Sequence, residues 1–277
     1  PFMAPCFGTI ARIARGNGHT KVLCQIDNVE PHERHLTDKP FNRYYLHSVD
    51  GFVYMSEQVH SELRAYSDAP ALFSPHPLFE NFGERVERSE ACVRLGLDPA
   101  NRYVLFFGLI RDYKGLDLLL DAWAQLRRAG RTEGRRLIVA GEFYTAREPY
   151  LNRIADNGLQ DEVLLHDRFI PDDDVKYYFS AADFVVQPYK TATQSGVTQI
   201  AYQFCVPMVV TKVGGLAEIV PDGRVGYVCE PTPEGVAGAI ERMYEGDTLQ
   251  RFRENCVEER RRFSWEEMCS RITELYG

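Results

Sequence analysis

The chain has 277 residues, 44% of them hydrophobic and 26% charged, a composition typical of a globular protein and not of a disordered one. Its 40 acidic residues outnumber its 32 basic residues, and the formal net charge of −8 excludes a general nucleic-acid-binding surface. A net negative charge does not exclude phosphate ligands, because backbone amides and a few local cations can bind them.

The first 21 residues are apolar and basic, with no acidic residue among them. Such a stretch fits a helix at a membrane surface or a helix that faces a protein core. We favour the core-facing helix.

Short apolar runs then alternate with amphipathic stretches, which indicates βαβ units and a parallel α/β fold. The helices that this pattern predicts most clearly cover residues 115–129, the segment capped by Asp172 to Asp174, and the segment from Val236 to Tyr244. The predicted strands are residues 22–26, 51–55, 103–107, 136–140, 162–165, 183–187, 208–211 and 226–229.

A segment rich in proline and charge, residues 75–88, suits a linker between two domains. We predict a first domain at residues 1–85 and a second at residues 86–262. Only about two strands precede the linker, so the first domain looks incomplete.

The seven cysteines are scattered and form no CxxC, so we expect buried thiols in a reducing cytoplasm. The histidines show no metal-ligand spacing with them, and a pair such as His32 and His35 is weak evidence for a site. We therefore predict no metal.

Residues 106–115 read FFGLIRDYKG, at the predicted turn between a strand and a helix. In doubly wound folds ligands bind at the carboxyl ends of strands. Gly108 permits close backbone approach, and Arg111 and Lys114 place two cations beside a helix start, which suits a diphosphate. The alternative is a tight turn with solvated charges.

Two later loops also follow predicted strands. In residues 188–199, a small polar loop reaches Ser-Gly at 195–196, where a helix is predicted to start. The free N–H groups of that helix start could bind an anion. The alternative is that Thr193 or Ser195 is an ordinary N-cap. The second loop carries Gly214 and Gly215, which allow tight backbone approach, followed by Glu218. The chain contains no GxGxxG, GxxxxGK[ST] or GxSxG pattern.

These segments, in this order and spacing, resemble glycosyltransferase family 4, the group 1 glycosyltransferases. The stretch 106–123, the stretch from Phe184 to Val220 and the FSW at 263–265 before a terminal helix carry the resemblance. It implies a GT-B-like α/β fold, in which two Rossmann-like parallel-sheet domains face a cleft and the first is incomplete. It also implies that the helix at about 263–277 packs back on the first domain, and that the chain belongs to a longer enzyme.

The activity implied by the resemblance is retaining transfer of a hexose from a nucleotide diphosphate sugar to a hydroxyl acceptor, a sugar or a lipid-linked sugar. No cofactor is implied. The expected location is the cytoplasm, with peripheral contact at the inner membrane face. Arg111 and Lys114 would stabilise the leaving diphosphate.

Further donor-binding residues are implied by the same resemblance: Gly108, Gly141, Glu142, Phe169, Ile170, Thr193, Gln194, Ser195, Gly196, Val197, Thr198, Gln199, Gly214, Gly215 and Glu218. The nucleotide base would lie near Arg168, Phe169 and Ile170. One departure concerns residues 193–199, which hold no carboxylate where the family carries a pair of glutamates; Gln194 and Gln199 are the nearest polar substitutes. A second is Leu109, which takes the place of a basic residue.

On the acceptor side, Asp27 follows the predicted strand 22–26, where the family often has a histidine, and His32 and Glu33 follow on the next loop. A carboxylate and a His–Glu pair there suit orientation or deprotonation of an acceptor. The alternative is a hydrogen-bonded loop. Two other functions stay open: a GT-B-fold epimerase or phosphorylase, and a non-catalytic binding or assembly protein, which the missing carboxylates favour.

Overall fold

The computed structural model describes residues 3–29 and 38–274 and divides the chain into two compact units. One unit contains residues 1–77 and 264–277, and the other contains residues 78–263. The predicted boundary lies at 85/86, later than the observed one. The larger unit begins earlier because Leu78 is buried in its core and Phe79 and Phe82 pack against that core. Residues 78–88 are therefore part of the larger unit and not a free linker.

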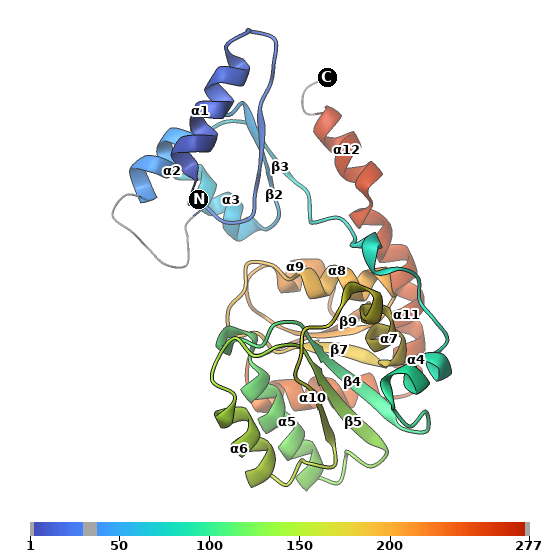
Figure 1. The fold of residues 1–277 in the computed structure, drawn as a ribbon. Helices are drawn as coiled ribbons and strands as arrows, with labels where there is room; N and C mark the ends of the chain where they lie inside the picture. Colours follow the sequence, from blue (N-terminus) through green and yellow to red (C-terminus); the bar gives the residue numbers. More distant parts are fainter. Residues whose placement is uncertain (1–2, 30–37, 275–277) are drawn as a thin grey trace. The chain divides into compact units, whose positions relative to one another are not determined.

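The larger unit contains a six-stranded, fully parallel sheet in the order β6-β5-β4-β7-β8-β9 (Figure 1). Its strands are β4 (Arg102–Phe107), β5 (Arg135–Ala140), β6 (Val163–His166), β7 (Phe184–Gln187), β8 (Met208–Thr211) and β9 (Gly226–Cys229). The strand order reverses direction between β4 and β7, which is the switch point where doubly wound folds bind ligands. All six strands confirm the predicted ones to within one residue at each end.

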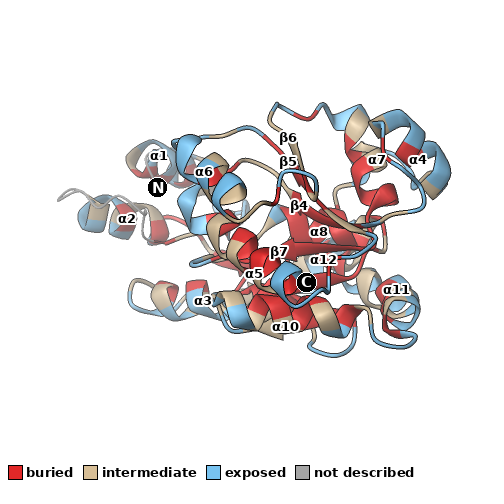
Figure 2. Cartoon of the chain, turned by 90° about the horizontal axis from the view of Figure 1, so that it is seen from below, coloured by how far each residue is buried: buried red, intermediate tan, exposed pale blue. Residues whose placement is uncertain are grey.

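Helices cover both faces of this sheet, because its strands are apolar on both sides (Figure 2). In β4, Tyr103 and Leu105 join one core cluster, whereas Val104 and Phe106 join the other. The first face packs against α4 (Arg88–Leu95), α7 (Asp172–Ala181) and α8 (Gly196–Gln203), and the second against α5 (Leu116–Arg128), α6 (Glu148–Asp156) and α10 (Pro233–Met243). The remaining helices are the short α9 (Leu216–Ile219) and α11 (Thr248–Glu259), with three 3-10 turns, η1 (Glu80–Phe82), η2 (Asp112–Lys114) and η3 (Arg260–Phe263).

Helix α5 shows why the sequence folds this way locally. The apolar residues at helical spacing are all buried, and the Trp123 indole also donates to the Glu162 carboxylate at 2.9 Å. In α7 the structure corrects a detail. Asp172 to Asp174 form the first turn, whereas the N-cap is Pro171 and supplies no side-chain bond. The three acids therefore favour the helix through its dipole and do not cap it.

The smaller unit contains a three-stranded parallel sheet in the order β1-β2-β3. Its strands are β1 (Leu23–Ile26), β2 (Gly51–Tyr54) and β3 (Ala71–Phe73), and its helices are α1 (Ala4–Arg15), α2 (Asp38–Leu46), α3 (Glu57–Arg64) and α12 (Trp265–Glu274). β3 is absent from the prediction of about two strands in this part of the chain. Helix α12 contacts this sheet through Arg271, which donates to the Phe73 carbonyl at 3.4 Å.

Helix α1 corrects the expectation of a core-facing apolar helix. Its buried residues are small, Ala4, Gly8 and Ala11, and Gly8 packs closely against Tyr44 of α2. Its large apolar side chains are exposed instead: Phe7, Ile10 and Ile13, after Met3 at the N-cap. No helix within the described residues is long and apolar enough to cross a membrane.

Candidate functional site

Three loops meet at the carboxyl edge of the six-stranded sheet. The 108–115 loop follows β4, the 188–195 loop follows β7, and the 212–215 loop follows β8. Glycines hold them together, because a side chain on Gly115 would collide with the Pro188 carbonyl and one on Gly214 with the Ala192 carbonyl. The Gly215 N–H also donates to the Thr193 carbonyl at 3.1 Å. The three predicted segments therefore form one continuous surface.

Lys114 lies at the centre of this surface, at the end of η2. It is only 9% exposed, and a Cβ on Gly108 would lie 3.1 Å from its Nζ. Its Nζ lies 5.9 Å from the centre of the Tyr189 ring. Burial, and second the charge of Arg111, lower the pKa of Lys114 to about 8.

Arg111 precedes η2 and is exposed, with its guanidinium 5.2 Å from the centre of the Tyr144 ring. Among residues 3–29 and 38–274, no carboxylate forms an ion pair with Arg111 or Lys114. Two unpaired cations one turn apart form a site that favours a doubly charged anion.

Side chains from distant elements fix the turn that carries these cations. The Asp112 carboxylate accepts hydrogen bonds from the Thr145 hydroxyl at 2.9 Å and the Tyr150 hydroxyl at 3.1 Å. Burial, with the bond to Asp112, raises the pKa of Tyr150 to about 12, so this phenol stays a neutral donor. Lys190, at the start of the 188–195 loop, binds Asp117 of α5 at 2.6 Å. Sequence reasoning missed these supporting residues.

The 188–195 loop ends at the N-terminus of α8, where Ser195 occupies the N-cap position without a side-chain capping bond. Its hydroxyl instead lies 3.1 Å from the Tyr189 hydroxyl. The first N–H groups of a helix have no partner within the helix, and this end of α8 follows the loop that packs on the 108–115 loop. Thr193, Gln194 and Ser195 are half-buried.

Behind this helix start, α8 is buried. Gly196 is exposed, whereas Val197, Thr198 and Gln199 are buried, and Val197 approaches Gly108. The Thr198 hydroxyl donates to Gln187 at 3.2 Å, and the Gln199 Oε1 is buried with no hydrogen-bond partner. A buried carbonyl oxygen without a hydrogen-bond partner lowers the stability of the fold. Gln199 is therefore a polar residue whose burial costs free energy.

The remaining predicted residues of this unit lie along the same edge. Gly141 follows β5 and packs against the Gly108 carbonyl, and the carbonyl of exposed Glu142 accepts from the Ile110 N–H at 2.8 Å. Phe169 is 66% exposed, whereas Ile170 belongs to the core. Glu218 lies on α9, beyond Gly215.

Sequence reasoning also missed His166 at the end of β6. Its Nδ1 lies 2.8 Å from the Tyr178 hydroxyl, and burial, with the charge of Arg168, lowers its pKa. Its carbonyl accepts from the Gly141 N–H at 3.2 Å. A neutral imidazole therefore stands at this edge. Its position after a strand, before Asp167 and Arg168, is the signal that could have identified it.

In the smaller unit, Asp27 follows β1 and is exposed. His32 and Glu33 lie outside the described residues. No group of three metal-ligating side chains gathers within residues 3–29 and 38–274.

Comparisons with known proteins agree with the fold. The family model described as "Glycosyl transferases group 1" matches residues 101–246. A relative named D-inositol 3-phosphate glycosyltransferase 2, from Catenulispora acidiphila, is 31% identical over 246 residues, which cover 83% of this chain and 56% of that protein. A D-inositol 3-phosphate glycosyltransferase from Segniliparus rotundus is 33% identical over 186 residues, 65% of this chain and 40% of that protein. The chain thus spans about half the length of the curated relatives it matches.

Solved structures show the same fold at lower identity. The structure of Anabaena Alr3699/HepE in complex with UDP matches with a TM-score of 0.79 and 18% identity, over 98% of this chain and 76% of that one. Sucrose-phosphate synthase from Thermosynechococcus elongatus matches with a TM-score of 0.76 and 21% identity, over 97% of this chain and 70% of that one. The GT-B fold predicted from the sequence is confirmed by these matches.

Proposed function

Because the chain belongs to the group 1 glycosyl transferases, we propose that its site binds a nucleotide diphosphate sugar and transfers the sugar to a hydroxyl acceptor. The relatives that it matches are named as glycosyltransferases, and one matched structure is described as a complex with UDP. Both descriptions support the proposal.

The observation that carries the proposal is Lys114, which is buried and has no carboxylate partner within the described residues. Burying a charged ammonium without a carboxylate costs stability, as its lowered pKa shows. The cost is offset when a diphosphate binds beside Gly108 and brings the missing negative charge.

The same geometry supplies a chemical role. When the bond between the sugar and the diphosphate breaks, negative charge grows on the leaving phosphate oxygen. Arg111 and Lys114, with the N–H groups at the start of α8, are fixed in place before that charge develops, and they stabilise it without reorganisation. The hydrogen bonds to Asp112 and the ion pair from Lys190 to Asp117 hold these groups in position.

The direct test is calorimetric titration of the protein with UDP, GDP, ADP and dTDP, comparing Lys114→Ala with the original protein. We expect at least about a tenfold loss of affinity for the preferred nucleotide in the variant, as for a charge-assisted bond worth about 1.5–3 kcal/mol. The matched control is Arg128→Ala, an exposed cation at the far end of α5, which leaves affinity unchanged. Equal affinity in all three proteins refutes the phosphate assignment.

The identity of the sugar as a hexose, retention of anomeric configuration and a sugar or lipid-linked acceptor are parts of the same proposal, as is the role of Asp27 near the acceptor. The exposed Phe7, Ile10 and Ile13 of α1 support peripheral contact with the inner face of the membrane. Sedimentation with anionic vesicles tests this contact. Reduced co-sedimentation of Ile10→Ser supports it, and no co-sedimentation of the original protein contradicts it.

One observation favours a second candidate, a non-catalytic binding protein. No carboxylate stands in the 193–199 segment, where the resemblance implies a pair of glutamates, and Gln199 is a neutral amide. Nucleotide binding without turnover of any nucleotide sugar by the full-length protein supports this candidate, whereas nucleotide release in the presence of an acceptor supports the transferase.

A further inference from the structure

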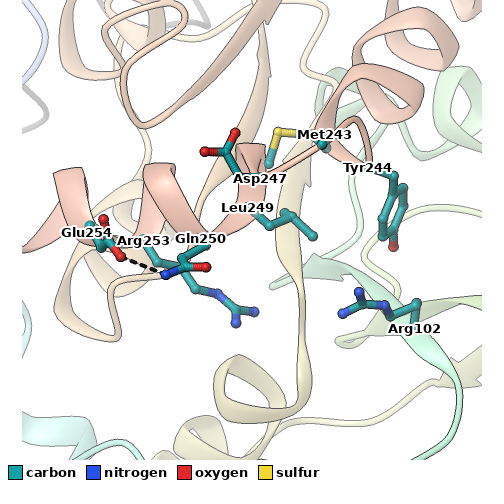
Figure 3. A pocket seen from close by; sticks show the side chains of 9 residues that line it. Arg102, Met243, Tyr244, Asp247, Leu249, Gln250, Arg253 and Glu254 are labelled. Atoms are coloured by element: carbon teal, nitrogen blue, oxygen red, sulfur yellow. Dashed lines mark hydrogen bonds between the residues drawn. The ribbon is translucent and has the colours of Figure 1, made fainter.

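A second pocket of the larger unit lies at the opposite edge of the same sheet, where β4 and β7 begin. It has a volume of about 430 Å³. It is lined by Arg102 at the start of β4 and by eight residues of α10, α11 and the turn between them: Met243, Tyr244, Gly246, Asp247, Leu249, Gln250, Arg253 and Glu254. Figure 3 shows the guanidinium groups of Arg102 and Arg253 directed into the same space, with the Tyr244 hydroxyl beside Arg102. The phosphate site described above uses none of these residues.

One buried carboxylate, Asp183, lies behind the pocket lining and contacts its arginines; it is 1% exposed. It accepts from the backbone N–H of Tyr103 at 3.1 Å and from Arg102 at 3.2 Å, and Arg253 lies 3.8 Å away. Asp183 thus pairs with one guanidinium group and lies near a second. Burial, with the charge of Arg85, lowers the pKa of Arg253.

Arg253 also retains an unused donor. One of its terminal nitrogens donates to the carbonyls of Ala182 and Asp183, both at 3.3 Å, but its Nε is buried with no hydrogen-bond partner. Guanidinium groups recognise phosphate and carboxylate through paired donors. An anion in this pocket therefore meets the guanidinium groups of Arg102 and Arg253, which are directed into it (Figure 3).

The first turn of α11 adds to the same preference. Asp247, its N-cap residue, makes no capping bond, because its carboxylate pairs with Arg251 at 3.1 Å. The first N–H groups of a helix attract anions. Two carboxylates line the pocket, but both are exposed and engaged, Asp247 with Arg251 and Glu254 with the Gln250 amide at 3.0 Å (Figure 3).

From this juxtaposition we propose that the pocket between Arg102 and the first turns of α11 is a second anion site, which binds a small phosphate-bearing molecule at the edge of the sheet opposite to the nucleotide-sugar site. The volume accommodates a phosphate ester or a diphosphate. The proposal does not depend on the transferase reaction, because no residue of this pocket takes part in it.

The test uses pyrophosphate as the probe and calorimetry as the measurement. All proteins carry Lys114→Ala, so that binding at the nucleotide-sugar site is weakened and the second site is read by itself. We expect one pyrophosphate per chain. Adding Gln250→Glu places a negative charge at the pocket and weakens binding about tenfold, which corresponds to about 1.4 kcal/mol. Arg102→Gln weakens it by a similar factor.

A further variant is expected to raise the affinity for pyrophosphate. Glu254→Gln removes an exposed carboxylate from the pocket lining and should tighten pyrophosphate binding several-fold. Gln250 and Glu254 are exposed on α11, so neither change removes a packing contact, and thermal unfolding checks that each variant folds. No pyrophosphate binding, or an affinity that Gln250→Glu and Arg102→Gln leave unchanged, overturns the proposal. A loss of nucleotide binding at the nucleotide-sugar site does not change pyrophosphate binding at this second site.

Discussion

The protonation of Lys114 predicts how nucleotide affinity depends on pH. With a pKa of about 8, the ammonium is present in about nine-tenths of the molecules at pH 7 and in about one-tenth at pH 9. Only the charged form pairs with a diphosphate. The dissociation constant for the preferred nucleotide therefore rises about tenfold between pH 7 and pH 9, a loss of about 1.4 kcal/mol of binding free energy.

The matched variant is Lys114→Arg. A guanidinium stays charged across this range, so the dependence that Lys114 causes disappears in this protein, whatever the absolute affinity. Calorimetry with one nucleotide at pH 7, 8 and 9 in both proteins measures the difference, and titration of the nucleotide cancels between them. Equal pH profiles for the two proteins would refute the reasoning that a buried Lys114 binds the diphosphate.

The same pKa predicts a stability effect of opposite direction. The pKa of Lys114 is about 8 in the folded protein against an ordinary value of 10.5, so between these values the unfolded chain binds more protons. Stability therefore rises with pH from about 8 to about 10.5, by up to about 3 kcal/mol from this one group. Lys114→Met should abolish this rise and stabilise the protein at pH 7, which urea unfolding at pH 7 and pH 10 measures. An unchanged rise with pH in the variant would show that Lys114 is not the cause.

Three further predictions concern the backbone and the support of the site. Gly214→Ala places a Cβ against the Ala192 carbonyl at a φ of +47°, and this should lower the free energy of unfolding by at least about 2 kcal/mol. The control is Gly238→Ala in the interior of α10, where an added Cβ has nothing within 4 Å. It should raise the free energy of unfolding by about 0.5–1 kcal/mol. Cys205 adopts a φ of +50°, so Cys205→Gly should gain about 1 kcal/mol in thermal or urea unfolding; a loss would show that its thiol contacts outweigh the strain. Asp112→Ala frees the turn at η2 and should weaken UDP affinity several-fold in calorimetry, and an unchanged affinity would show that the turn holds itself.

Much of the larger fold could be predicted from the sequence because its strands are buried on both faces. A strand such as β5 is then a continuous apolar run, bounded by turn residues, and its ends can be identified to within a residue. β3 lacks this signal. Its three residues, Ala71–Phe73, are only half-buried and follow a proline, so nothing distinguishes them from a loop until β2 pairs with them.

Helix α1 shows where periodicity misleads. Its apolar residues recur at helical spacing, which predicts a buried face, yet the buried residues are the small ones. Close approach to Tyr44 selects Gly8 for its lack of a side chain, and no scale of hydrophobicity records that preference. Helix position could be predicted, but the direction of its apolar face depends on a neighbour 36 residues away.

Some residues of the candidate site could also be predicted from the sequence, whereas others could not. Gly108, Arg111 and Lys114 could be identified because they stand in one short segment between a strand and a helix. Thr145, Tyr150 and Lys190 could not, because each acts on a residue more than 30 positions away, and only the folded sheet brings them together.

The absence of carboxylates from residues 193–199 preserves the positive charge of the candidate site. Gly214 and Gly215 hold this segment close to the other loops of the site, so a glutamate there would bring negative charge towards the two cations. In the part of the chain that the structure describes, the Gln199 carbonyl oxygen has no hydrogen-bond partner and Lys114 forms no ion pair. A chain with a net charge of −8 thus retains positive charge at this edge of its sheet. Because residues 193–199 carry no negative charge, Arg111 and Lys114 attract a diphosphate more strongly. The bound diphosphate then supplies the negative charge that neutralises the buried ammonium of Lys114.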